Sequence, residues 1–396
     1  MRVKLGEIVE QVRGVSYKPE NLHDELNENS IILLRANNIK DGLLNFDDVV
    51  YVDKKKVSEK QILRAGDILV CASSGSKELV GKAAYIPNDF HATFGAFCKV
   101  VRPKIGIRAY IGHYFNSPIY RRQISEASAG ANINNIRNEH IDDLSLEYPD
   151  EQIQHNVVSI LDKVSDLIAM RKKQLQKLDD LVKSRFIELF GDPFNNKKWD
   201  TQKLRNISVS ISDGSNVDKT YYEDEGDVLF LRIQNVWFNE FRLDDSVYIS
   251  EDVNNEYLDT SLHHGDLLIT KIGRYYTKDS SLGRVSVYLG EDDKANYSNN
   301  IMRVRLTDEV CSEFVNILMN LDDYNRYIRE VSVGGTDKRA LSKAIIGDLP
   351  IMMPPKELQL EFLEFVRQID KSKSTIQQSL DKLELLKKAL MQKYFG

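Results

Sequence analysis

The chain has 396 residues, of which 42% are hydrophobic and 29% are charged, a composition typical of globular domains. It excludes a disordered tail, a collagen-like fibre and a small disulfide scaffold, and no apolar run is long enough to span a membrane. The net charge of −6 excludes a basic field over the whole protein, so any nucleic-acid site must be local or shared with a partner. Three widely spaced cysteines fit a reducing compartment and argue against structural zinc, and we expect a cytoplasmic location.

Short apolar runs separated by clusters of Gly, Asn and Asp fill the first part of the chain, which is the pattern of strands and turns. We expect strands at 31–34, 49–52, 67–72 and 96–101. A helix is expected near 111–125. This first module is therefore assigned to the α+β class.

A long amphipathic helix is predicted from Glu151 to Phe190, because apolar residues recur there at spacings of three, four and seven. Arg171–Lys173 interrupts this apolar stripe, and Gly191-Asp192-Pro193 ends the helix. The predicted stripe consists of Ile153, Val157, Ile160, Val164, Leu167, Ile168, Leu175, Leu178, Val182, Leu189 and Phe190.

The second half of the chain repeats the first. Residues 34–51 and 231–248 match at seven of eighteen positions, and Gly66-Asp67 recurs as Gly265-Asp266. The offset between copies rises along the chain, which indicates an insertion of about eight residues near Tyr275–Ser281 in the second copy. A second long helix then follows, with an apolar residue every seven positions, as in a coiled coil, at Phe362, Ile369, Ile376, Leu383 and Leu390.

The repeat predicts the architecture. Each module leads into a long helix, so the second helix should run back antiparallel to the first, and the N-terminus should lie near Gly396. We expect an α+β protein with two pseudo-two-fold-related mixed α/β modules, separated by two long antiparallel helices that form a coiled coil. The four parts are the modules 1–148 and 192–353 and the spacer helices 149–191 and 354–396.

The sequence carries no recognisable active-site motif. Gly75–Ala83 resembles a phosphate-binding loop but has one residue too many and lacks the final hydroxyl. Asp192-Pro193-Phe194 follows a helix rather than a strand, and the seven histidines have no metal-ligand spacing. We therefore predict no catalytic residue, no metal site and no cofactor held by this chain.

Polar loops that differ between the copies are the candidate binding residues. Arg, Lys, Asn and Gln side chains read base edges, and Ser-Gly turns offer backbone amides to phosphates; the alternative is that these are ordinary solvated loops. Arg35 and Arg232 are identical in the two copies, so we expect them to hold structure rather than specify a base. The candidate DNA-binding residues are Arg35, Asn37, Asn38, Ser74, Ser76, Lys77, Asn132, Asn134 and Arg137 in the first module, and Arg232, Gln234, Asn235, Lys271, Arg274, Tyr275, Lys278, Lys338 and Arg339 in the second.

With these features, the sequence resembles the specificity subunit of type I restriction-modification enzymes over essentially the whole chain. The resemblance rests on the duplicated order of module and helix. Within each copy it rests on L-G-E-I at 5–8, the L-R-x-x-N signature, Gly-Asp-Ile/Leu-Leu at 66–69 and 265–268, and helices that end in Phe-Gly. Glu147–Asp150 departs from the usual double proline, and Glu357-Leu358 from Glu-Gln, which leaves the helix starts open.

The resemblance implies that each module is a target recognition domain that reads one half of a bipartite, asymmetric DNA target. The helices would set the spacing and dock the modification subunits. It implies double-stranded DNA, two modification (methyltransferase) subunits and two restriction (translocase and nuclease) subunits as partners, and no membrane. S-adenosylmethionine, ATP and Mg would be bound by those partners, not by this chain.

Two other hypotheses remain open on the sequence. The chain could be a coiled-coil scaffold that pairs two protein-binding modules. It could also be a self-sufficient restriction enzyme, although this requires methylase or nuclease motifs that the sequence lacks.

Overall fold

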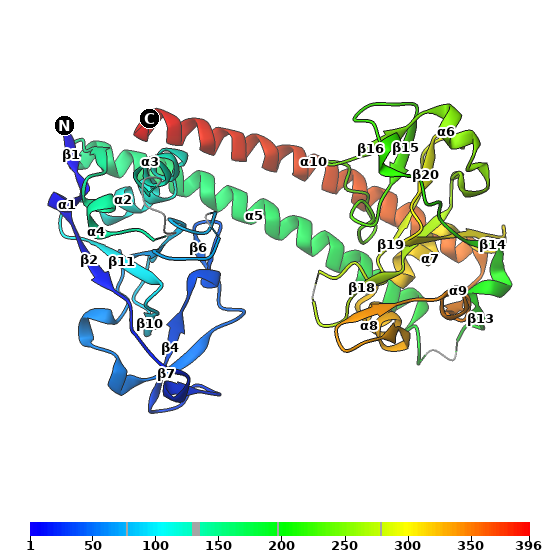
Figure 1. Ribbon diagram of the computed structural model, residues 1–396, viewed down its shortest axis with the longest axis horizontal. Coiled ribbons are helices and arrows are strands. Elements are labelled where there is room, and N and C mark those ends of the chain that lie inside the picture. Colours follow the sequence, from blue (N-terminus) through cyan, green and yellow to red (C-terminus); the bar gives the residue numbers. More distant parts are fainter. Residues whose placement is uncertain (77, 129–134, 196–197, 278) are drawn as a thin grey trace. The chain divides into compact units, whose positions relative to one another are not determined.

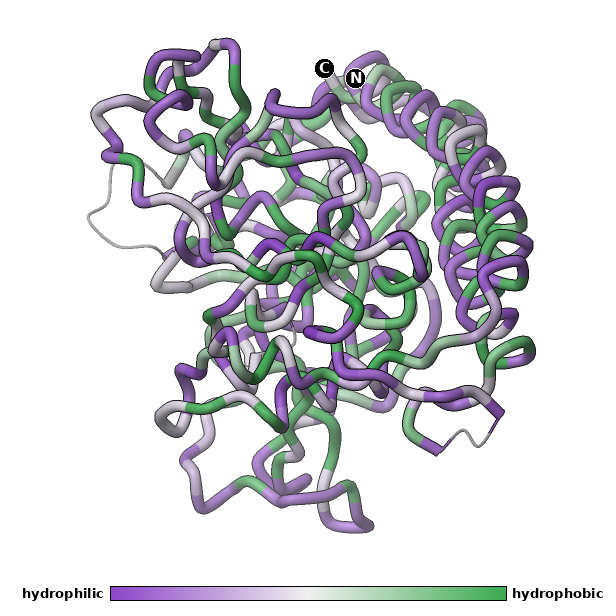
Figure 2. The backbone as a smooth tube through the Cα atoms, turned by 90° about the vertical axis from the view of Figure 1, so that its right-hand side faces the viewer, coloured by the Kyte–Doolittle hydropathy of each residue, from purple (hydrophilic) through white to green (hydrophobic). Residues whose placement is uncertain are grey.

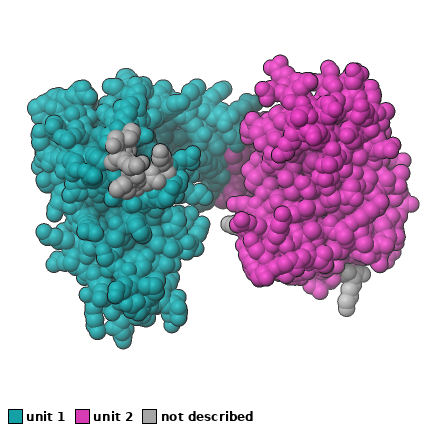
Figure 3. Space-filling view, in the orientation of Figure 1, with its two compact units in different colours: residues 1–174, 376–396 teal, residues 175–375 magenta. Residues whose placement is uncertain are grey.

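A computed structural model describes residues 1–76, 78–128, 135–195, 198–277 and 279–396. The chain divides into two compact units (Figure 3). Unit 1 comprises residues 1–174 and 376–396, and unit 2 comprises residues 175–375. Each unit therefore contains one mixed α/β module together with parts of both long helices.

Two four-stranded sheets form the centre of unit 1. The first has the order β2(Val9–Arg13)-β11(Cys98–Pro103)-β8(Ile68–Cys71)-β9(Ala83–Tyr85), and the second has the order β10(Ala92–Phe94)-β4(Ser30–Leu34)-β7(Val50–Asp53)-β3(Leu22–His23). Two small pairs, β1(Arg2–Lys4) with β12(Ser145–Glu147) and β5(Ile39–Lys40) with β6(Leu43–Leu44), complete the strands of this unit. The four strands predicted from sequence are confirmed as β4, β7, β8 and β11.

Short helices pack against the first of these sheets (Figure 1). They are α1(Leu5–Ile8), α2(Arg108–Phe115), α3(Pro118–Ser128) and α4(Asn138–Asp142). The helix expected near 111–125 is thus two helices. The helix is interrupted at Asn116 and Ser117. There the Ser117 hydroxyl donates a hydrogen bond to the Tyr114 carbonyl and accepts one from the Tyr120 amide.

Unit 2 repeats this topology. Its sheet β14(Ser208–Asp213)-β21(Ile301–Leu306)-β17(Leu267–Thr270)-β19(Val285–Val287) has the strand order of β2-β11-β8-β9, and β16(Val247–Ile249)-β15(Val228–Leu231)-β20(Ala295–Tyr297) corresponds to β7-β4-β10. The pair β13(Thr201–Lys203) with β24(Pro350–Met352) corresponds to β1 with β12, and the helices are α6(Glu251–Asn255), α7(Ser312–Met319), α8(Asp322–Val331) and α9(Lys343–Gly347). The duplication read in the sequence is therefore a duplication of the fold.

One small sheet in unit 2 is matched in unit 1, among the described residues, only by a single antiparallel β-bridge between Ser73 and Asn135. It has the order β18(Ile272–Arg274)-β23(Lys338–Ala340)-β22(Val333–Gly334). The insertion predicted near Tyr275–Ser281 directly follows β18. The longer second copy thus builds an extra hairpin-like surface from two segments that are distant in sequence.

The duplicated Gly-Asp pairs are structural. Gly66 and Gly265 have φ of 89° and 90°, a backbone conformation that favours glycine. The carboxylate of the following Asp67 is buried and accepts two hydrogen bonds from Arg102, each of 2.8 Å. Asp266 and Arg305 repeat the arrangement at 2.8 and 2.7 Å. These bidentate contacts raise the pKa of both guanidinium groups, so each unit keeps a closed ion pair in its interior.

The long helices α5(Glu151–Phe190) and α10(Lys356–Phe395) each have 40 residues, about 60 Å at 1.5 Å per residue. In unit 1, Leu161 near the start of α5 lies in the same core as Phe395 at the end of α10. In unit 2 the relation is reversed, since the Phe190 ring lies 5.4 Å from that of Phe362. The antiparallel pairing expected from the repeat is confirmed within each unit, and Figure 2 shows the alternation of apolar and polar residues along both helices.

The apolar stripe predicted for α5 was wrong in part. Leu161, which the prediction omitted, is buried together with Val157 and Val164, whereas Ile153 and Ile160 are exposed. At 100° per residue, these two exposed residues lie on average about 60° around the helix axis from the buried group. The helix therefore carries two neighbouring apolar faces, of which only one is covered.

A buried glutamine defines the start of each long helix. The Gln154 amide oxygen accepts from the Ile107 amide at 3.2 Å, and its amide nitrogen donates to the Pro149 carbonyl at 2.8 Å. Gln359 repeats both bonds, to Cys311 at 2.9 Å and to Pro354 at 2.8 Å. The helix starts left open by the sequence are thus fixed by the same side chain in both copies.

The two ends of the chain meet in unit 1, as expected. Val3 and Leu5 share a core with Met391 and Phe395, and the N and C labels lie close together in Figure 1.

Candidate nucleic-acid interface

The L-R-x-x-N signature folds into the same turn in both units. The Asn38 side chain accepts from the Arg35 amide at 2.7 Å and donates to the carbonyls of Asn45 and Asp48. Asn235 accepts from the Arg232 amide at 2.9 Å and likewise bonds the segment that follows. The two asparagines have exposed fractions of 1% and 0%. Their amides hold the turn and are not available to DNA, so these two residues leave the candidate set.

An aspartate closes each of these turns from the side. The Asp48 carboxylate accepts from Arg35 at 2.9 Å and from Asn37 at 2.7 Å. Asp245 accepts from Gln234 at 3.2 Å and pairs with Arg232. The arginines do hold local structure, as their identity in both copies predicted. Because the carboxylates of these ion pairs are exposed, each pair is worth at most about 1 kcal/mol.

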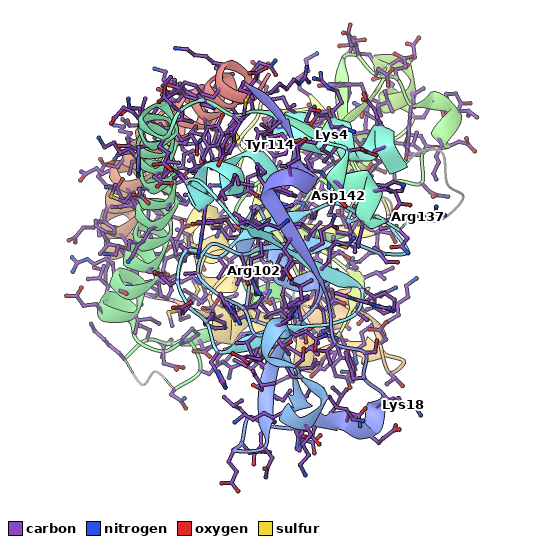
Figure 4. All side chains as sticks on the ribbon, turned by 90° about the vertical axis from the view of Figure 1, so that its left-hand side faces the viewer. Lys4, Lys18, Arg102, Tyr114, Arg137 and Asp142 are labelled. Atoms are coloured by element: carbon purple, nitrogen blue, oxygen red, sulfur yellow. The ribbon has the colours of Figure 1, made fainter. Side chains whose placement is uncertain are left out.

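The remaining candidates of unit 1 that the structure describes lie at one edge of the module. Ser73 forms a β-bridge with Asn135, and the Ile136 amide donates to the Ala72 carbonyl at 2.7 Å. Ser74 accepts from the Ser76 amide within the same loop. These contacts bring the loop at 73–76 beside the segment that leads to Arg137, which points outward in Figure 4. Candidates Lys77, Asn132 and Asn134 lie outside the described residues.

In unit 2 the extra sheet joins two candidate segments. Arg274 and Lys338 are opposite each other in the β18–β23 pair, and the Arg339 guanidinium lies 4.0 Å from the centre of the Tyr275 ring. Arg274 is also within 3.7 Å of Asp337. The structure thus gathers four of the predicted residues on one small surface.

Lys271 does not join this surface. The Lys271 ammonium pairs with Asp213 and its side chain is largely covered. Its contacts fit a residue that ties β14 to β18 better than one that is presented to a ligand. Lys278 lies outside the described residues.

A polar pocket of about 500 Å³ lies beside the Arg232–Gln234 turn of unit 2. Its other walls are the loop after β14 and the turn between β20 and β21. Sequence reasoning missed this last turn. The strands on either side share only three of nine residues with their counterparts in unit 1, so the repeat carried little signal there. The pocket is lined by Ser215, Asn216, Val217, Asp218, Lys219, Tyr222, Arg232, Ile233, Gln234, Ser298, Asn299 and Asn300.

Within the described part of the chain, no group of three or more His, Cys, Asp or Glu side chains is placed to hold a metal ion. Nor does any described helix have both the length and the apolar character that a bilayer span requires. The arrangement that stands out is thus a pair of homologous α+β units on a shared scaffold, each with its own polar loops.

Comparisons with known proteins agree with this class. Residues 1–180 match the family described as type I restriction modification DNA specificity domain. The chain is 27% identical, over 97% of its length and 86% of the relative, to the type I restriction enzyme StySPI specificity subunit of Salmonella potsdam. It is 29% identical, over 93% of its length and 82% of the relative, to the type I restriction enzyme EcoKI specificity subunit of Escherichia coli.

The fold is also that of solved type I proteins. The S subunit of a type I restriction-modification system from M. genitalium aligns with a TM-score of 0.52 at 13% identity, over all of this chain and 96% of its own. A structure described by the complex assembly and conformational transition of the type I R-M system aligns with a TM-score of 0.54 at 14% identity, over all of this chain and 97% of its own. Together the comparisons support a specificity subunit of type I restriction-modification systems, as the duplicated motifs predicted.

Proposed function

We propose that the chain is the DNA-reading, non-catalytic subunit of a type I restriction-modification complex. Each unit would read one half of a bipartite, asymmetric double-stranded target. The observation that supports the proposal is the contrast between the scaffold and its loops. The turns at Arg35 and Arg232 are held by corresponding hydrogen bonds, whereas the loops beside them differ in length and chemistry. Two such scaffolds with different loops suit two different short sequences.

The long helices support docking of modification subunits. Ile153, Ile160, Leu167 and Met170 are exposed on the part of α5 that belongs to unit 1. The first three are seven residues apart, so they line one face of the helix. An exposed apolar row of this kind suits a protein partner.

The complex would supply what this chain lacks. Two modification subunits would bind S-adenosylmethionine and methylate adenine, and two restriction subunits would bind ATP and Mg. The net charge of −6 fits such an assembly, since the partners can provide phosphate contacts. We further propose that helix length sets the unread gap between the half-sites.

The deciding experiment is co-expression of the chain with its modification subunit, followed by sequencing of the methylated adenines. A single bipartite motif is expected. Assembly with the modification subunit but no sequence preference in methylation would contradict the proposal and favour a coiled-coil scaffold for two protein-binding modules.

A further inference from the structure

The turn between β10 and β11 in unit 1 and the turn between β20 and β21 in unit 2 have the same backbone. In unit 1, Gly95 donates its amide to the Leu34 carbonyl at 2.9 Å, and Cys98 donates to Gly95 at 2.8 Å. In unit 2, Ser298 donates to the Leu231 carbonyl at 2.9 Å, and Ile301 donates to Ser298 at 3.0 Å. The turns at 95–98 and 298–301 are therefore equivalent elements of the duplicated fold.

Further contacts fix both turns in place. The Phe97 carbonyl accepts from the Ala72 amide at 2.9 Å, and the Asn300 carbonyl accepts from the Lys271 amide at 2.9 Å. A glycine faces each turn at close range: a Cβ on Gly14 would lie 2.1 Å from the Gly95 carbonyl oxygen, and a Cβ on Gly214 would lie 2.3 Å from that of Ser298. The turns are thus rigid and held alike, which means that their side chains are presented in the same way.

The central side chains differ in chemistry although the backbones agree. Unit 1 has Ala96 and Phe97, and unit 2 has Asn299 and Asn300 at the same places. Phe97 is 71% exposed and belongs to no buried core of the described residues. Asn299 is exposed, and both asparagines line the polar pocket beside the Arg232 turn.

Both turns lie next to the candidate loops of their units. Gly95 bonds Leu34, which precedes Arg35, while Phe97 accepts from the amides of Ala72 and Ser73. In unit 2, the turn and the Arg232–Gln234 segment are walls of one pocket. The central residues of both turns therefore lie beside the polar loops of their units.

We propose that these turns discriminate bases, with Phe97 in contact with the C5 methyl group of a thymine and the Asn299–Asn300 pair hydrogen-bonded to an adenine edge. Phe and Ala side chains contact the thymine methyl, and asparagine bonds adenine at N6 and N7. The inference rests on the proposed function and deepens it, because it names the side chains that make the two half-sites different.

The first test uses the full chain assembled with its modification subunit and target duplexes in which single thymines are replaced by uracil, which lacks only the methyl group. One replacement in the half-site read by unit 1 should weaken binding about fourfold, the loss expected for one buried methyl. Phe97→Asn should abolish this sensitivity, whereas Phe97→Leu should retain it. Ile105→Asn, the same kind of change at an exposed position of unit 1, is the matched control and should behave as wild type.

The second test addresses unit 2 with 7-deazaadenine, which removes the N7 acceptor. One replacement in the other half-site should weaken binding on the order of tenfold. Asn299→Ala and Asn300→Ala should bind the natural target more weakly, and the variant that loses the contacting side chain should no longer respond to the replacement.

The outcomes separate this inference from the proposed function. A wild-type complex without a methylated motif would contradict the proposed function itself. A bipartite motif whose binding is indifferent to every uracil and 7-deazaadenine replacement would overturn only the role of the turns. The role of the turns would also be contradicted if the Phe97 and asparagine variants assemble, unfold at the wild-type temperature and respond to each base replacement as wild type does.

Discussion

At the scale of single residues, the residues that are identical in the two copies hold the fold together. Asn38 and Asn235 lock turns, Asp67 closes an interior ion pair, and Gln154 pins a helix start. Sequence comparison of the copies could identify these positions, but it could not separate burial from DNA contact, because Asn and Arg serve both purposes. The turn at 95–98 was missed for the opposite reason, since Phe97 carries no polar group that marks a binding residue.

The ion pair of Asp67 with Arg102 leads to a stability prediction. Asp67→Ala leaves the Arg102 guanidinium, which is mostly buried (Figure 4), without its carboxylate. We expect a loss of about 3–5 kcal/mol in the free energy of unfolding, measured by urea denaturation. Asp48→Ala, which removes the exposed partner of Arg35, is the matched control and should cost at most about 1 kcal/mol. Equal losses in the two variants would contradict the assignment of Asp67 to the scaffold.

Lys99 gives a pH-dependent prediction. Burial lowers the pKa of its ammonium group from 10.5 to about 8, although the group donates to Gln11 at 3.0 Å and to Asn138 at 2.8 Å. Between these two values the unfolded chain binds more protons than the folded chain, so this residue makes the free energy of unfolding rise with pH from about 8 to 10.5. Lys99→Met removes the effect.

The measurement compares wild type and Lys99→Met by denaturant unfolding across that window. The free energy of unfolding of wild type, minus that of the variant, should increase with pH. A difference that stays constant would mean that the folded and unfolded chains release this proton at the same pH, and a difference that decreases would mean that folding raises the pKa of Lys99.

At the scale of elements, periodicity predicted the long helices well and their faces less well. The heptad row of α10 points inward, with Phe362 in the core of unit 2, whereas Ile153 and Ile160 of α5 remain uncovered. Periodicity reports only that residues share a side of the helix. It does not tell how much of the helix surface is buried by the residues packed against it. The apolar residues of α5 span a wider arc of the helix than its own unit buries.

The glutamines at the helix starts can be tested directly. Gln154→Ala and Gln359→Ala each leave a backbone amide and a carbonyl without their partner, and we expect each to cost about 1–3 kcal/mol in the free energy of unfolding. Gln152→Ala, two residues away and exposed, is the matched control and should change stability by less than about 0.5 kcal/mol. Wild-type stability in both buried variants would rule out a role in fixing the helix starts.

The proposed link between helix length and target spacing is also a property of elements. The test inserts seven residues into each helix, between Gln174 and Leu175 in α5 and between Thr375 and Ile376 in α10. Both positions lie at the boundary between the units, so neither unit is interrupted. The insertion keeps the helix faces nearly in phase and adds about 10 Å. At 3.4 Å per base pair, the gap between half-sites should lengthen by up to about three base pairs, with the same letters in both halves.

Sequencing of methylated adenines measures this gap. A variant with the insertion in α5 alone is the control. We expect it to assemble less well, because α5 then has seven residues more than α10 and the two paired helices no longer match in length. An active double-insertion variant that methylates the original motif with its original gap would exclude helix length as the determinant.

At the scale of the whole molecule, the repeat allowed most of the fold to be predicted. Two α+β modules and two antiparallel helices could be predicted from the duplicated motifs, because an element predicted in one copy is supported when the same element is predicted in the other. The extra sheet of unit 2 was foreseen only as an insertion, since the pairing of Arg274 with Lys338 joins segments that are far apart in sequence. Contacts of this kind depend on the folded chain and leave no local periodicity.

The duplication predicts that the two units read DNA independently. Residues 1–145 can be exchanged for the same region of a relative with another target, provided that the donor fills the contacts which the helices make with this module. These include the Tyr110 ring, 5.1 Å from that of Phe395, and the buried side chains of Val157 and Leu161.

If these contacts are kept, the exchange replaces the loops at 35–38, 73–76 and 95–98 together and leaves unit 2 untouched. Sequencing of methylated adenines should then show one half of the motif changed and the other half unaltered. A change of both halves at once would mean that the units read the target jointly, since no loop of unit 2 differs between the parent and the hybrid.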